Sequence, residues 1–296
     1  MKTTIYQQLI ALLLLVSLPL AAVAGDDYTK NYSKAFTTKG VNTLSIMNKY
    51  GDVNIKNWNK AEVSIKVTIT VDARSEADAK DLFEDIEIRL EKHNGEIIGH
   101  TAINMRSSRS NFSVDYEIFM PKTLGVALEN KYGNVYINEL SGHVDLTLKY
   151  GTLRVNKLLR GDEKPHNSVD ISYCENSHIR EANWLKLNMA YSKIDVERST
   201  ALMVLSKYSK LYTEIGNSIV AEGKYDDYKL GALDKLILET KYSDCSLDKL
   251  QNRLEAEMKY TDMEVEEIPA SFSVIDLDAQ YGEVELGIEE GASYRL

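Results

Sequence analysis

Four acidic residues recur at one position of a repeating sequence and are the first candidates for chemistry. Each follows a tyrosine by two residues, and they are Asp227, Asp244, Asp262 and Glu283, with Asp226 beside the first of them. If the repeats stack as neighbouring strands, adjacent carboxylates lie about 5 Å apart at one corner. This acidic corner has three interpretations: a solvated turn, an edge that binds calcium, or a pair of catalytic carboxylates acting on a polysaccharide.

Lysines and tyrosines of the same repeats are the second candidate group. The binding candidates beside the acidic corner are Lys224, Lys241, Lys259, Tyr225, Tyr242 and Tyr260. Three residues before the tyrosine, acidic side chains also recur: Glu129, Asp170, Glu222, Glu239, Glu257 and Asp278. We expect this acidic column beside the lysine column, in a lattice of exposed ion pairs worth about 0–1 kcal/mol each. The lattice is either a solvated face or a docking surface for a polar ligand.

Other chemical motifs are few. The sequence has no phosphate-binding glycine loop and no His-x-x-x-His or Cys-x-x-Cys spacing, although His166, His178 and Cys174 share one irregular repeat that could bind zinc. We predict no cofactor, with calcium as the alternative.

Cys174 and Cys245 stand four repeats apart, roughly 19 Å at the spacing of strands, so we predict two unpaired thiols, with Cys245 in the core.

The repeat itself is a short phrase centred on tyrosine. It begins at Lys131-Tyr132-Gly133, and from Tyr173 onward the tyrosines fall 18, 17, 17, 17, 18 and 21 residues apart. An isolated early copy surrounds Tyr50. A fixed period this short indicates stacked units.

Apolar residues within each repeat alternate with period two, which is typical of half-buried strands. The alternation runs up to the tyrosine and places it on the apolar face; after a small residue such as Gly133 the apolar positions change phase, which indicates a corner. The sequence therefore predicts an all-β fold, a parallel β-helix (β-solenoid) of about nine to ten rungs of 17–18 residues. We expect the tyrosines to stack in a column, or to form a ligand platform.

Three segments are predicted along the chain. Residues 1–24 read as a secretory signal peptide, too short for a membrane span, and no other stretch is apolar enough to be one. Residues 25–125 hold the first rung and an N-terminal cap, with a strand at Val63–Val71, a helix beginning after Ser75, and strands near 87–90, 96–102 and 112–119 around a polar loop, Arg106–Ser110. Residues 126–296 form the remaining rungs.

These motifs together resemble a known family. The passages "SEADAKDLFEDIEI", "NFSVDYEIFMP" and "LENKYGNVYI" occur in the order typical of the bacterial putative-adhesin family of unknown function, a toastrack-like β-solenoid domain. The resemblance covers most of the chain and includes no catalytic motif. It implies a β-solenoid at the bacterial cell envelope. The chain departs from the pattern at the irregular rung Arg160–Ile179, which carries an extra loop.

We therefore predict a non-catalytic, adhesin-like interaction module that is exported to the periplasm or cell surface. Its formal net charge of −10 disfavours nucleic acid and anionic lipid as partners. We expect the partner to be a glycan or an envelope protein. A carbohydrate-active hydrolase or lyase that uses the acidic corner is one alternative, and a structural or stress-sensing envelope protein is another. The oligomeric state is left open.

Overall fold

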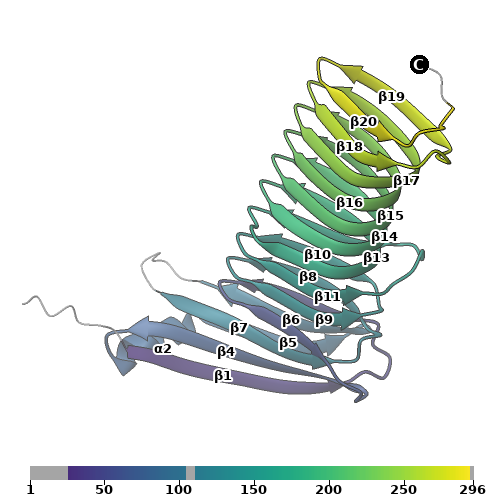
Figure 1. Cartoon of the computed structure of the whole chain (residues 1–296). Helices are drawn as coiled ribbons and strands as arrows, with labels where there is room; N and C mark the ends of the chain where they lie inside the picture. The colour runs from purple at the N-terminus through teal and green to yellow at the C-terminus, as the bar shows by residue number, and fades with distance from the viewer. Residues whose placement is uncertain (1–25, 105–110, 294–296) are drawn as a thin grey trace, which may run out of the picture.

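The protein is an elongated coil of β-strands. The computed structural model describes residues 26–104 and 111–293, of which 71% lie in strands and one short segment in a helix. The strands wind through about nine turns, so the predicted all-β solenoid is confirmed. Figure 1 shows the coil rising from a group of N-terminal strands to β20 at the far end.

Each turn of the coil has two arms, which are separate strands early in the chain and one bent strand later. The two-strand turns comprise β2 (Thr43–Lys49), β3 (Val53–Asn57), β8 (Gly125–Lys131), β9 (Val135–Leu140), β10 (Val144–Lys149) and β11 (Leu153–Leu158). The later strands are β12 (Asn167–Ser172), β13 (Ser177–Ala190), β14 (Lys193–Lys207), β15 (Lys210–Lys224), β16 (Asp227–Lys241), β17 (Asp244–Lys259), β18 (Asp262–Ile268), β19 (Val274–Gln280) and β20 (Val284–Ile288). Equivalent residues pair in parallel register, as Lys207 does with Lys224.

The repeat tyrosines form the corner between the two arms. All ten, from Tyr50 to Tyr281, have φ between 49° and 62°, in the left-handed region. This conformation turns each ring outward, and the rings from Tyr132 onward are exposed. The prediction that the tyrosine lies on the apolar face is therefore wrong, because the left-handed residue reverses the side that its side chain would occupy in a strand.

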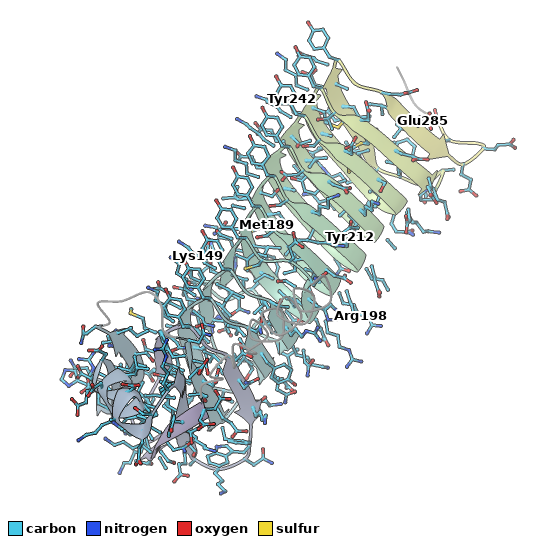
Figure 2. The ribbon with its side chains drawn as sticks, turned by 90° about the vertical axis from the view of Figure 1, so that its left-hand side faces the viewer. Lys149, Met189, Arg198, Tyr212, Tyr242 and Glu285 are labelled. Atoms are coloured by element: carbon cyan, nitrogen blue, oxygen red, sulfur yellow. The ribbon has the colours of Figure 1, made fainter. Side chains whose placement is uncertain are left out.

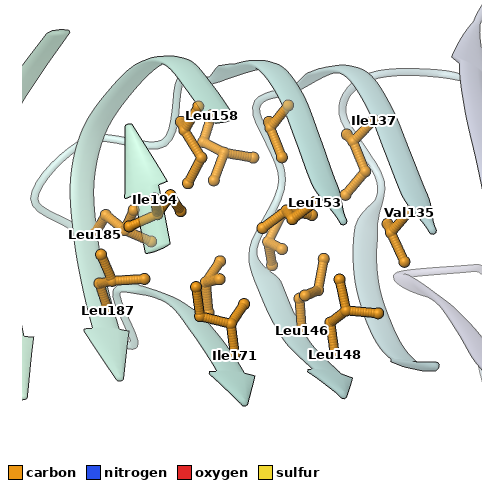
Figure 3. Close-up of a cluster of buried hydrophobic side chains, with 14 of the residues drawn as sticks. Val135, Ile137, Leu146, Leu148, Leu153, Leu158, Ile171, Leu185, Leu187 and Ile194 are labelled. Atoms are coloured by element: carbon orange, nitrogen blue, oxygen red, sulfur yellow. The ribbon is translucent and has the colours of Figure 1, made fainter. Parts of the chain in front are cut away.

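The core fills the space between the two arms along the whole coil. Figure 3 shows side chains from both arms meeting, including Leu146, Leu153 and Leu185, which are all fully buried. Apolar positions before the corner and the phase-shifted positions after it both point inward, as the alternation predicts. No turn buries its apolar side alone, so each one depends on its neighbours.

The backbones of successive turns approach closely at the residue after the tyrosine. A Cβ atom added to Gly151 would lie 2.0 Å from the carbonyl oxygen of Gly133, and one added to Gly133 would lie 2.0 Å from that of Gly51. These glycines are required by contact between turns rather than by their own φ.

The N-terminal elements close the first turn. They are β1 (Asp26–Thr37), β4 (Glu62–Ala73), α2 (Glu76–Glu84), β5 (Ile86–His93), β6 (Glu96–Ile103) and β7 (Phe112–Met120). β6 pairs with β2 and β7 with β3, both in parallel, on the side of the first turn that faces away from the coil. β5, β4 and β1 then extend this sheet by antiparallel pairing. The free edge of the first turn is thus covered, as the predicted cap requires.

The predicted cap elements agree with these bounds. Ser75 caps α2 by accepting a hydrogen bond from the Asp78 amide at 3.1 Å. The edge strand β1 was not predicted, because it is mostly polar and exposed and carries only a weak apolar signal. The predicted signal peptide, 1–24, and the polar loop Arg106–Ser110 lie outside the described residues. In the described part of the chain, no helix has the length and apolar character to cross a membrane.

Close packing at the corner yields a stability prediction. Gly151→Ala forces two backbones apart, so we expect it to lower the free energy of unfolding by about 1–3 kcal/mol. Gly161→Ala is the control, because a Cβ there has nothing within 4 Å; its effect should stay within about 0.5 kcal/mol. Urea unfolding followed by circular dichroism measures both, and equal stability of the two variants would contradict the contact.

Candidate functional site

The exposed tyrosines form one continuous column along the coil. Successive ring centroids from Tyr50 to Tyr281 lie 4.7–5.1 Å apart, with interplanar angles of 1–17°. Figure 2 shows the rings, Tyr242 among them, projecting along one edge of the coil. Phe112 meets the ring of Tyr50 edge-on at 5.2 Å and extends the column into the cap. The predicted stacking is confirmed, and each stacked pair contributes about 0.5–1.5 kcal/mol beyond burial.

Several of the lysines that precede the tyrosines lie against the column. Lys131 Nζ is 4.8 Å from the ring centroid of Tyr132, and Lys259 Nζ is 5.5 Å from that of Tyr260. Within residues 26–104 and 111–293, no ion pair joins this lysine column to the acidic column that precedes it by two residues. The expected lattice of ion pairs is therefore wrong, and the ammonium groups of Lys131, Lys207 and Lys259 lie instead over the faces of tyrosine rings.

The four residues of the acidic corner meet as their register predicts. Asp227, Asp244, Asp262 and Glu283 together line an open concavity of about 310 Å³ on the arm that follows the tyrosine. Lys224, Lys241 and Lys259 end the arm that precedes it, and neither they nor Tyr225, Tyr242 and Tyr260 line the concavity. The structure thus divides the predicted site residues into two groups, on different arms of the turn.

The carboxylates of this corner have unequal partners. Asp262 accepts a hydrogen bond from the Glu283 amide at 2.9 Å, and Asp227 pairs with Lys210 at 3.2 Å, whereas Asp244 is exposed. In the described residues, no three His, Cys, Asp or Glu side chains are placed to hold a metal ion. Calcium binding at this corner remains a prediction.

The zinc site considered for the irregular repeat does not form. His166 Nε2 lies 2.9 Å from Asp162, and His178 Nε2 lies 2.8 Å from Glu197. Cys174 is instead buried in the core. The zinc interpretation is wrong because the strand alternation sends these three side chains to different surfaces.

Both cysteines are unpaired and buried, as predicted. Burial raises the pKa of Cys174 and raises that of Cys245 to about 12. A thiol whose pKa is raised in this way is a poor nucleophile and metal ligand at neutral pH. Neither cysteine is therefore a candidate for chemistry, and both serve as small core side chains.

Asp226 does not belong to the acidic corner. Its side chain is buried, and its Oδ1 accepts a hydrogen bond from the Ser209 amide at 2.8 Å. Its Oδ2 lies 2.9 Å from Ser206 Oγ and 3.2 Å from the Tyr228 hydroxyl. The residue directly after the tyrosine points inward, so the placement of Asp226 beside the exposed carboxylates is wrong.

Asp226 is one member of a buried polar ladder that links successive corners. In each step, the amide of the residue after one tyrosine donates to the side-chain oxygen of its equivalent in the next turn. The ladder runs from Cys174 through Ser192, Ser209, Asp226 and Ser243 to Thr261, with N···O distances of 2.8–3.3 Å. Its signal in the sequence is the recurrence of serine after the tyrosine, which by itself indicates only a turn preference.

Burial of the Asp226 carboxyl group in its charged form costs free energy of folding, whereas the neutral hydroxyl groups of the ladder carry no such charge. Burial is the largest cause that raises its pKa, and the four hydrogen bonds that oppose this do not cancel it. A carboxyl whose pKa is higher in the folded than in the unfolded chain favours folding most below its unfolded pKa. That contribution is lost as the pH rises through the folded pKa.

Replacement of Asp226 by asparagine should therefore stabilise the protein at neutral pH. The asparagine side chain keeps the acceptor for the Ser209 amide and provides a donor to Ser206 or Tyr228, without a buried charge. We expect the melting temperature of Asp226→Asn to exceed that of the wild type at pH 7, and the difference to vanish below about pH 3.9, the ordinary aspartate pKa. Asp244→Asn, on an exposed side chain, is the control; a less stable Asp226→Asn at pH 7 would contradict the buried-charge account.

Comparison with known proteins gives structural matches only. No protein-family model matches the chain, and neither does any curated protein. Among solved structures, a "putative adhesin" from Parabacteroides distasonis ATCC 8503 matches with 13% identity over 86% of this chain and 96% of its own, at a TM-score of 0.43. A "putative adhesin" from Parabacteroides merdae ATCC 43184 matches with 11% identity over 86% and 95%, at 0.37. A "putative lipid binding protein", also from P. distasonis, matches with 9% identity over 88% and 97%, at 0.34. Two of these three neighbours carry the name putative adhesin, as does the family that the sequence resembles.

Proposed function

We propose that the protein is a non-catalytic interaction module of the cell envelope, exported to the periplasm or cell surface, and that it binds an extended glycan along its tyrosine column. The column together with the lysines that precede it forms a ribbon of aromatic faces and polar groups over the length of the coil. Sugar rings present C–H groups on one face and hydroxyls at the edge. Aromatic faces pack against the C–H groups, and neighbouring polar side chains form hydrogen bonds with the hydroxyls.

The observation that carries this proposal is the exposure of the column. From Tyr132 to Tyr260 the rings are 39–49% exposed, and the ring of Tyr281 is 74% exposed. Parallel strand pairing and the buried core already hold the turns together, so the fold alone does not require large aromatic side chains on the surface. A contiguous exposed aromatic surface is typical of an interaction site.

The charge of the ribbon narrows the class of ligand. Two residues before the lysines of the column stand exposed acids such as Glu222, Glu239 and Glu257. The ribbon is therefore close to neutral locally, while the whole chain carries a net charge of −10. This balance favours a glycan over a polyanion such as nucleic acid.

A hydrolase or lyase acting at the acidic corner is the second candidate, because the corner lines a concavity. Catalysis by two carboxylates requires one to be held protonated, commonly by burial. The carboxyl group whose pKa burial raises, Asp226, lies in the inner ladder and does not line the concavity. The exposed position of Asp244 favours a solvated turn instead.

The proposal is tested by replacing tyrosine with a residue that lacks the ring but still tolerates the left-handed backbone conformation. Asparagine tolerates positive φ, so Tyr225→Asn combined with Tyr242→Asn removes two rings with little backbone cost. We expect this double variant to bind linear oligosaccharides at least about tenfold more weakly than wild type. The Tyr225→Phe and Tyr242→Phe double variant keeps the stacking surfaces and is the matched control.

The same binding measurements distinguish the alternatives. They are made on the purified protein by calorimetry, with and without calcium, and the sugar is analysed afterwards for cleavage. Failure of the wild type to bind any envelope glycan would overturn the proposal. Release of shorter sugars that Asp244→Asn abolishes would establish the enzyme instead, and binding that requires calcium would assign the acidic corner as the site.

A further inference from the structure

The lysine column is interrupted once in the middle of the coil. Lys149 pairs in register with Ser172, Ser172 with Ala190, and Ala190 with Lys207. Two successive turns therefore carry a small side chain where the neighbouring turns carry lysine. Both positions face outward on the arm that precedes the tyrosine.

The tyrosines at this interruption form the flattest part of the column. The ring of Tyr173 is inclined by 3° to that of Tyr150 and by 1° to that of Tyr191, with centroids 4.9 and 5.1 Å apart. In some other turns the preceding lysine lies over the ring, as Lys207 lies 5.2 Å from the centroid of Tyr208. Because Ser172 and Ala190 replace lysines, the rings that follow them have no ammonium group of their own strand above them.

A hollow opens at the interruption, on the arm that precedes the corner, and Ser172 and Ala190 are part of its lining. It measures about 310 Å³, near the lower end of the ~300–1,000 Å³ typical of small-molecule sites. Its lining comes from three turns: residues 170–172, 188–190 and 205–207. Leu205 is 45% exposed in this lining, so the hollow has an apolar floor open to solvent.

Polar groups at one side of the hollow have unused hydrogen-bonding capacity. Asn188 Nδ2 donates to Asp170 Oδ1 at 2.5 Å. Asn188 Oδ1 is buried and has no hydrogen-bond partner. A buried acceptor without a partner is costly, and a ligand hydroxyl that reached it after a small rotation of the amide would remove that cost.

We propose that this hollow is the principal sugar subsite of the column and that it takes a neutral pyranose. The apolar face of the sugar lies on Ala190 and Leu205 beside the rings of Tyr173 and Tyr191, and its hydroxyls bond to Asp170 and Asn188. The carboxylate of Asp170 accepts from hydroxyls and the ammonium group of Lys207, which also lines the hollow, donates to them, so one negative and one positive charge favour a sugar without net charge. This inference rests on the proposed glycan binding and adds the place and the class of sugar.

Restoring the missing lysines tests the subsite. Ala190→Lys and Ser172→Lys, made separately, place an ammonium group over the bare rings and fill the hollow. The probes are cellopentaose, chitopentaose and maltopentaose as neutral sugars, and tetragalacturonate as an anionic one. We expect either variant to bind the preferred neutral sugar at least about tenfold more weakly than wild type, and wild type to prefer it over tetragalacturonate.

Gln280→Lys is the matched control, because Gln280 occupies the same column in the last turn, outside the hollow. It should bind like wild type, and circular dichroism establishes that all variants are folded. If the lysine variants bind normally while loss of Tyr225 and Tyr242 weakens binding, the glycan proposal stands and the subsite is wrong. If the wild type binds none of the sugars, both are wrong.

Discussion

The left-handed backbone at the repeat tyrosines is the constraint on which the rest of the solenoid depends. One such residue shifts the alternation of side chains by a single position between the two arms of a turn. Apolar residues can therefore point inward on both arms, although the apolar phase differs before and after the corner. Because the reversal recurs at the same place in every turn, equivalent residues pair in register from β13 to β17. A slip of one residue would expose the core side chains of an arm, which makes the register strongly specified.

The same corner produces two linear arrays, one on each side of the backbone. Outside, each tyrosine ring stacks on the next. Inside, the amides after the tyrosines from Cys174 to Ser243 each bond to a side-chain oxygen in the following turn. Both arrays arise because parallel strands repeat about every 4.8 Å, close to the spacing of stacked rings and within reach of a hydrogen bond from a short side chain. Glycine replaces serine in the early turns, such as at Gly133 and Gly151, because the backbones there are in direct contact.

A surface that is built from sequence repeats is long and uniform. Its shape and chemistry change locally where one residue departs from the repeat. The lysine column is interrupted in the middle of the coil at Ser172 and Ala190 and ends at Gln280 in the last turn, and the inner ladder of hydroxyl groups is interrupted at Asp226. The first interruption lies on the surface and opens a hollow on the arm that precedes the corner, whereas the second lies in the interior and introduces a buried carboxyl group. The cap differs from both, since β6 and β7 cover the edge of the first turn by pairing with β2 and β3.

The sequence by itself determined the period, the parallel stacking, the tyrosine column, the cap elements around α2 and the unpaired state of Cys174 and Cys245. Each of these depends on residues near one another in the repeat, or on the spacing that the repeat imposes. Only the tertiary structure decided which way the tyrosine faces, whether Asp226 is buried, and that Lys131, Lys207 and Lys259 contact rings rather than Glu or Asp. Period-two alternation cannot reveal a reversal made by one left-handed residue. Likewise, side-chain partners across turns depend on how the outward groups of neighbouring turns meet in space.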